Sequence, residues 1–159
     1  MRVVWVLGVA MALAGCAHDR VPRGGETITY AYSSSGLCLA CASYTVTLGP
    51  DGQGIFAGER NTGVVGERRF QATPDQVRRF VAQLQPYRPN GELLMNQTPP
   101  CKQLPTDQDS VDVRWQPALA SPAHLGFYAG CDYERNRAMA AALFSAPDLL
   151  PIADLIGKH

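Results

Sequence analysis

The sequence has no excess of charge of either sign, because 14 lysines and arginines face 14 aspartates and glutamates in 159 residues. Proteins that bind nucleic acid, or that attach to anionic lipid headgroups through charge, carry clusters of basic residues. The chain contains no such cluster. We therefore exclude nucleic acid as a partner, and a polybasic segment as the means of membrane attachment.

The sequence also lacks an apolar segment long enough to cross a bilayer as a helix. The longest apolar run extends from Val3 to Leu13, which is well short of the roughly 20 residues that such a helix needs. Arg2 precedes the run and small residues follow it, as in a secretory signal peptide. A short transmembrane helix and an ordinary signal peptide are the alternatives, but an ordinary signal peptide needs no cysteine at position 16.

Cys16 follows the tripeptide Leu-Ala-Gly directly, and this segment resembles the bacterial lipobox. The resemblance implies that residues 1–15 are a lipoprotein signal peptide and that Cys16 carries fatty acids such as palmitate. Residue 17 is alanine rather than aspartate, which by the sorting behaviour of Gram-negative bacteria implies the periplasmic face of the outer membrane. Residues 16–25 are polar and interrupted by proline and glycine, so we expect a lipidated, flexible tether.

Residues 26–159 are enough for a single domain with its own core. Six segments have the alternation or composition of half-buried strands. They are residues 27–32, 43–48, 55–57, 67–72, 111–115 and 124–128. The sequence Gly49-Pro50-Asp51-Gly52 separates the second segment from the third and is typical of a hairpin turn.

Two helices are predicted, together with an apolar C-terminal segment, residues 149–156, that packs on the core. The first helix begins after Thr73, which is its predicted N-cap and forms a capping box with Gln76. The second begins after Asp132, as its N-cap, and ends near Pro147. We therefore predict an α+β domain, with an antiparallel sheet of about six strands and two to three helices packed on one face.

One long segment shows no periodicity. Residues 89–105 contain four prolines, two of them adjacent, and we expect an irregular surface loop that Cys101 pins in place. The aspartates that follow, Asp107, Asp109 and Asp112, suggest a calcium site. However, the glycine and the distant glutamate of an EF-hand loop are missing, so we predict no metal there.

The segment around the first cysteine pair carries a family resemblance. It reads Cys38-Leu39-Ala40-Cys41-Ala42-Ser43-Tyr44, followed by a strand, an Asp-Gly turn and a strand that ends in glycine. This arrangement is similar to the domain-of-unknown-function family numbered 6438, whose members often have Cys-Phe-Gly-x-Cys-Pro-x-Tyr. The present chain has one residue fewer between the cysteines and Ala42 in place of proline. The resemblance extends over roughly residues 25–157 and implies a fold, but no activity.

Four cysteines remain after Cys16, namely Cys38, Cys41, Cys101 and Cys131. An even number of cysteines in an oxidising compartment favours two disulfides, for which three pairings are open. We favour Cys38–Cys41 with Cys101–Cys131. Loop entropy then gives about 2 kcal/mol to the short ring and about 3–4 kcal/mol to the long one, so that the second bridge contributes more stability.

Three functional roles for these cysteines compete with the structural one, namely redox exchange, zinc binding and nucleophilic catalysis. Thiol–disulfide exchange at Cys38 and Cys41 would require an activated thiol, but a strand rather than a helix is predicted to follow them, and no lysine, arginine or histidine lies within five residues of either. A four-cysteine zinc site is disfavoured because Cys101 and Cys131 are far apart in sequence. A cysteine hydrolase would have His124 as its only well-placed base, and a disulfide-bonded cysteine cannot be its nucleophile.

The sequence thus favours a non-catalytic envelope lipoprotein without a cofactor. Its expected partners are the membrane, through the lipid on Cys16, and another envelope protein. The alternative is a thiol–disulfide oxidoreductase or redox sensor that uses Cys38 and Cys41.

Overall fold

A computed structural model describes residues 25–36, 38 and 40–157 of the chain. The predicted signal peptide, Cys16 and all of the tether except Gly25 lie outside these residues. No helix within the described part is long and apolar enough to cross a membrane.

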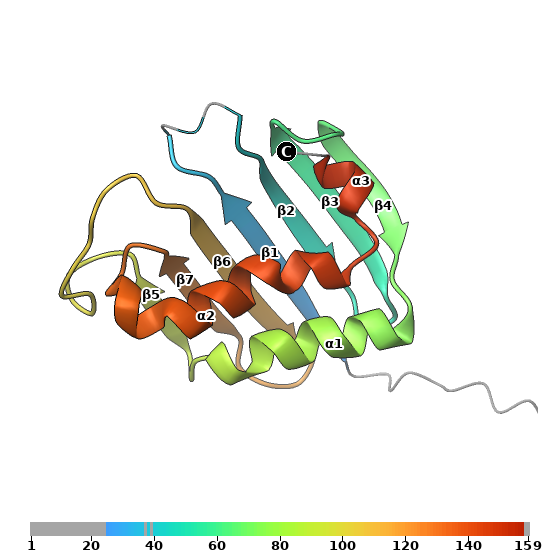
Figure 1. Cartoon of the computed structure of the whole chain (residues 1–159). Coiled ribbons are helices and arrows are strands. Elements are labelled where there is room, and N and C mark those ends of the chain that lie inside the picture. Colours follow the sequence, from blue (N-terminus) through green and yellow to red (C-terminus); the bar gives the residue numbers. More distant parts are fainter. Residues whose placement is uncertain (1–24, 37, 39, 158–159) are drawn as a thin grey trace, which may run out of the picture.

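A single seven-stranded sheet forms the centre of the domain (Figure 1). Its strands lie in the order β4-β3-β2-β1-β6-β7-β5, and every neighbouring pair is antiparallel except β5 and β7. The strands are β1 (Glu26–Ser33), β2 (Ser43–Leu48), β3 (Gln53–Arg60), β4 (Gly66–Gln71), β5 (Glu92–Met95), β6 (Ser110–Pro117) and β7 (Ala123–Tyr128).

The prediction of an α+β domain is confirmed, but the sheet has seven strands rather than about six, and the pairing of β5 with β7 is parallel. The additional strand, β5, lies inside the proline-rich segment that was expected to be irregular. It runs parallel to β7, with Leu93 opposite Leu125, and the His124 amide donates to the carbonyl of Gly91 just before it. A strand of four residues at the edge of a sheet is too short to show an alternating pattern, so its sequence does not reveal it.

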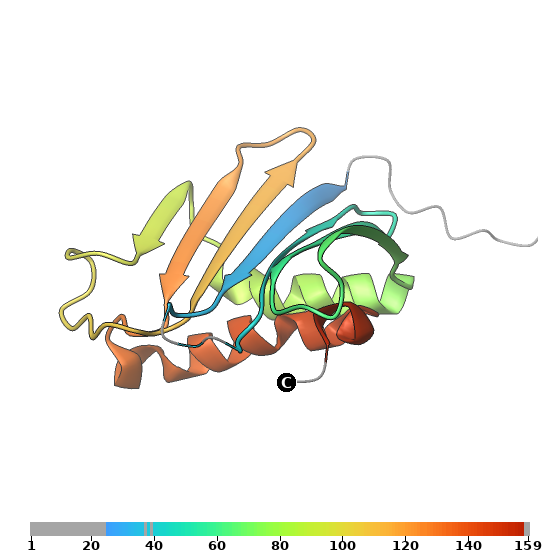
Figure 2. The same ribbon diagram turned by 90° about the horizontal axis from the view of Figure 1, so that it is seen from above.

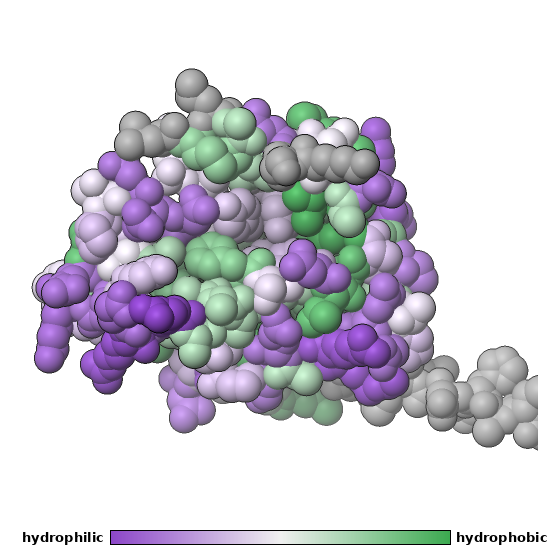
Figure 3. All heavy atoms as spheres, in the orientation of Figure 1, coloured by the Kyte–Doolittle hydropathy of each residue, from purple (hydrophilic) through white to green (hydrophobic). Residues whose placement is uncertain are grey.

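The helices are α1 (Pro74–Leu84), α2 (Tyr133–Ser145) and α3 (Ala153–Ile156), with 3₁₀ turns at Gln85–Tyr87 and Ala146–Leu149. All three α-helices cover the same face of the sheet (Figures 1 and 2). In Figure 3 this face shows hydrophilic side chains over α1 and the beginning of α2, and hydrophobic ones over α3.

The N-terminus of α1 confirms its prediction, because the Thr73 hydroxyl accepts from the Gln76 amide and the Gln76 side chain accepts from the Thr73 amide. The prediction for α2 is right in position and wrong in mechanism. Asp132 precedes the helix with a left-handed backbone, and its side chain makes no capping hydrogen bond. The carboxylate of Asp132 is used elsewhere, as described below.

The core lies between the sheet and the helices. Alternate residues of β2 are buried there, as predicted, while Thr45 and Thr47 point to the opposite face. Phe80 of α1 and Leu143 of α2 are fully buried against the sheet. The buried Tyr30 hydroxyl donates to the Leu143 carbonyl at 3.0 Å, which joins β1 to α2. The opposite face of the sheet carries no helix (Figure 2).

Candidate functional site

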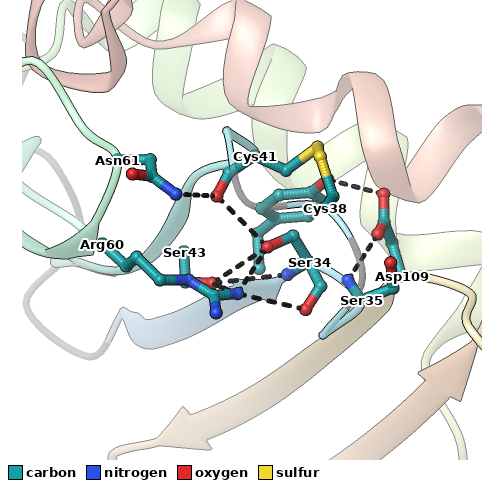
Figure 4. Close-up of a disulfide and its surroundings, with 9 residues drawn as sticks. Ser34, Ser35, Cys38, Cys41, Ser43, Arg60, Asn61 and Asp109 are labelled. Carbon is teal, nitrogen blue, oxygen red and sulfur yellow. Dashed lines mark hydrogen bonds between the residues drawn. A yellow bond between two sulfur atoms is a disulfide. The ribbon is translucent and has the colours of Figure 1, made fainter.

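The first cysteine pair lies in the loop between β1 and β2. Cys38 and Cys41 form a disulfide with their Cα atoms 5.3 Å apart, in the pairing that the sequence favours. The loop turns back on itself at this point, because the Cys41 amide donates to the Cys38 carbonyl and the Cys38 amide donates to the Ser35 carbonyl. Figure 4 shows the side chains that surround this loop.

Arg60 reaches the base of the loop from the end of β3. Its Nη2 donates to the Ser34 hydroxyl at 2.8 Å and also lies 3.5 Å from the Ser43 hydroxyl. A register shift in the β2–β3 pairing places Arg60 directly opposite Ser43, and such irregularities re-aim side chains at the end of a ladder. Ser34 and Ser43 are only 7% and 5% exposed, so the guanidinium supplies hydrogen bonds to two hydroxyls that water hardly reaches.

The carbonyl of Cys41 is held by two further donors. The Asn61 side-chain amide donates to it at 3.0 Å and the Ser34 hydroxyl at 3.2 Å. Asn61 has a positive φ of 51°, a backbone conformation that asparagine tolerates better than most residues. The turn after β3 thereby fixes the second half of the disulfide loop.

The first half of the loop is held from the other side by Asp109. Its carboxylate accepts from the Ser35 amide at 2.8 Å and from the Tyr32 hydroxyl at 2.6 Å. Burial, the hydrogen bond to Asp109 and the negative charge of Asp109 all raise the pKa of Tyr32. The phenol therefore stays protonated and remains a donor at any physiological pH.

These surroundings decide what the cysteine pair can do chemically. A cysteine becomes reactive when a helix N-terminus or a nearby cation stabilises its thiolate. The cysteine pair lies between β1 and β2. The negatively charged carboxylate of Asp109 accepts from the amide of Ser35, three residues before Cys38. Arg60 is the opposing feature, because it is a cation that contacts Ser43, two residues after Cys41, although it is distant from the cysteines in sequence. Its hydrogen bonds go to Ser34 and Ser43.

The second disulfide joins Cys101 to Cys131, both of which are 1% exposed. The Asp132 carboxylate accepts from the backbone amides of Lys102 and Gln103 at 3.0 and 2.8 Å. These contacts and the disulfide attach the proline-rich loop to the N-terminus of α2. The arrangement is that of a structural bridge.

His124 lies on the face of the sheet that carries no helix, where its ring contacts two carboxylates. Nδ1 is 2.9 Å from Glu92 and Nε2 is 2.6 Å from Asp112. Burial acts to lower the pKa of His124 and so does Arg114, but the hydrogen bonds to Asp112 and Glu92 and the charge of Asp112 raise it above the ordinary value of 6.5. Both ring nitrogens are held by carboxylates, so His124 is not a free base beside a thiol.

The three aspartates considered for calcium do not come together. Asp107 accepts from the Thr106 hydroxyl, Asp109 binds Tyr32, and Asp112 binds His124. No group of three or more histidine, cysteine, aspartate or glutamate side chains in the described ranges could hold a metal ion. Glu92 and Asp112 bind opposite nitrogens of His124, so their carboxylates do not converge on one point.

Comparison with protein families finds a match that covers more than half of the chain. The model of the family described as Domain of unknown function (DUF6438) matches residues 29–121. The match includes the Cys38–Cys41 loop and Cys101 but ends before Cys131. No curated protein and no solved structure matches the chain.

Proposed function

The chain belongs to the DUF6438 family, and on that premise we propose that it is a non-catalytic binding or structural module of the bacterial envelope. Lipid on Cys16 holds it at the periplasmic face of the outer membrane, and its partner is another envelope protein. The domain itself begins with β1, directly after the tether.

One observation carries the non-catalytic part of this proposal. The Cys38–Cys41 disulfide is fixed at both halves of its loop, by Asn61 on the Cys41 carbonyl and by Asp109 on the Ser35 amide. An exchanging disulfide must instead present one sulfur to a substrate in an environment that stabilises the thiolate. The contacts of this loop favour a bridge that shapes the end of the sheet.

The two disulfides also support the envelope location. Disulfides persist in oxidising compartments such as the periplasm and are rare in the cytosol. A signal peptide that ends in a lipobox delivers a protein to that compartment, so the cysteine pattern and the N-terminal motif point to the same place.

The second candidate function is thiol–disulfide exchange or redox sensing at Cys38 and Cys41. The observation that favours it is Arg60, because a guanidinium near a cysteine can stabilise a thiolate. Its engagement with the buried hydroxyls of Ser34 and Ser43 makes this the weaker candidate.

The anchor is tested by intact-mass analysis and membrane fractionation. The wild-type protein should carry acyl mass and start at Cys16, and Cys16→Ala should lack this mass and leave the membrane fraction. Ala17→Asp is the matched control, since it should keep the acyl mass and move to the inner membrane. A wild-type protein without acyl mass would refute the anchor.

The redox alternative is tested separately. In glutathione buffer poised near the potential of the periplasm, the Cys38–Cys41 bond should stay oxidised, and the protein should not reduce insulin or refold scrambled substrates. Reduction of the bond under these conditions, with insulin turnover that Cys38→Ser abolishes, would establish the oxidoreductase instead.

A further inference from the structure

The hairpin turn between β6 and β7 presents an apolar side chain to solvent. Leu119 is 95% exposed, more than any other large hydrophobic residue in the part of the chain that the structure describes. The turn and its flanks, residues 117–123, read Pro-Ala-Leu-Ala-Ser-Pro-Ala and contain no charged residue. An uncharged tip with a protruding leucine is suited to an apolar partner rather than to water.

This tip lies at the end of the sheet where the N-terminal tether enters. Glu26, the first residue of β1, pairs with Pro117, the last residue of β6. Both views of the molecule show the beginning of β1 beside the β6–β7 turn (Figures 1 and 2). The Cys38–Cys41 loop lies at the opposite end, because it follows the last residue of β1.

The reach of the tether limits how far this end can be from the lipid. Residues 17–25 separate Cys16 from Glu26, and nine residues span at most about 30 Å even when fully extended. This is close to the length of β1 itself, an eight-residue strand of about 27 Å. Attachment at Cys16 therefore keeps the turn within about one strand length of the bilayer.

A single leucine would not hold a freely diffusing protein on a membrane. A covalent tether changes this, because it converts the second contact into an intramolecular event at a high effective concentration. Membrane attachment is generally secured by two signals acting together. A weak apolar contact close to the anchor is the kind of contact that a short tether makes effective.

We propose that the β6–β7 turn is a second membrane contact, with Leu119 inserted among the lipid headgroups and acyl chains beside the Cys16 anchor. This inference rests on the proposed lipid anchor. It gives the domain a defined orientation, in which the tip of the β6–β7 turn faces the bilayer and the Cys38–Cys41 loop faces away from it. The disulfide end is then the end available to an envelope protein.

The orientation can be measured with tryptophan probes in the lipidated full-length protein, reconstituted into vesicles of phosphatidylethanolamine and phosphatidylglycerol. The probes are Leu119→Trp and, as a matched control, Val65→Trp in the β3–β4 turn at the opposite end of the sheet. Val65 is also an exposed apolar residue, at 68%. The native Trp115 is fully buried. Its emission is the background signal, and it is measured in the unsubstituted protein. Equal melting temperatures of both variants check that the substitutions leave the fold intact.

The expected result is a blue shift of the Leu119→Trp emission and a loss of its intensity in vesicles that contain brominated lipids, with neither change for Val65→Trp. Unshifted, unquenched emission from both probes in acylated protein would overturn the membrane contact while leaving the anchor intact, and would assign the turn to a protein partner. Equal quenching of both would overturn the orientation. Absence of acyl mass on the protein would refute the anchor and this inference together.

Discussion

The Tyr32 hydroxyl donates a 2.6 Å hydrogen bond to the carboxylate of Asp109. Tyr32 lies near the end of β1 and Asp109 directly precedes β6, so the bond joins two neighbouring strands through their side chains at the edge of the disulfide loop. The same carboxylate holds the Ser35 amide. This pair therefore connects the central strands to the loop that contains Cys38 and Cys41.

Replacing Tyr32 by phenylalanine should lower the free energy of unfolding by about 1–2 kcal/mol, because a hydrogen bond to a charged group is lost. Tyr133→Phe is the control and should change stability little, since its half-exposed ring makes no side-chain hydrogen bond within the described chain. Urea unfolding measures both. If the effect arises from the Tyr32–Asp109 bond, the loss in Tyr32→Phe and Asp109→Asn combined should be less than the sum of the two single losses.

The Cys101–Cys131 bridge should contribute about 3–4 kcal/mol through loop entropy. Cys101→Ser and Cys131→Ser should each lose an amount of this order, and the double variant should lose little more than either, because the bridge is already absent. The measurement is denaturant unfolding of the three variants with the Cys38–Cys41 bond intact. Losses that add in the double variant would show that the two cysteines are not partners.

The His124 cluster should make stability depend on pH in a defined direction. In the folded protein the pKa of His124 is raised above 6.5, the ordinary value that applies to this side chain in the unfolded chain. The protonated ring therefore stabilises the fold in full below about pH 6.5, and this contribution is lost as the pH rises through the folded-state pKa.

The test compares the wild type with His124→Gln by urea unfolding between about pH 6 and about pH 9, a range in which histidine titrates. The wild type should be more stable by about 1–2 kcal/mol at the acidic end, as expected for hydrogen bonds between charged groups, and the difference should shrink towards the alkaline end. Glu92→Gln should reduce the same difference. A difference that stays constant, or that grows with pH, would contradict the assigned charge state.

The pH dependence of Cys38 alkylation tests whether Arg60 stabilises a thiolate at this position. In the reduced protein, alkylation of Cys38 by iodoacetamide should follow an ordinary thiol, with a midpoint above neutral pH, because Arg60 is engaged with Ser34 and Ser43. Mass spectrometry follows the adduct in the wild type and in Arg60→Gln, and the two profiles should nearly coincide. A midpoint well below neutral pH that Arg60→Gln shifts upward would favour the redox function.

Local features of the domain could be predicted from sequence because they depend on neighbouring residues. The hairpin turn is an example, since Gly52 has a φ of +81° and its amide donates to the Gly49 carbonyl. The capping box of Thr73 and Gln76 is another. The even number of cysteines and the oxidising compartment favour two disulfides, and the two that form have the preferred pairing among the three open ones.

The sequence by itself thus determined the positions of α1, α2 and the strands with an alternating pattern, because backbone preference and hydrophobic periodicity act over a few residues. Only the tertiary structure decided which distant side chains meet. Strand β5, the contact of Arg60 with Ser34, the binding of the Asp132 carboxylate to Lys102 and the enclosure of His124 by two carboxylates all join segments far apart in the chain. Such contacts follow from the order and register of the strands, which hydrophobic packing and backbone hydrogen bonding of the whole sheet fix together.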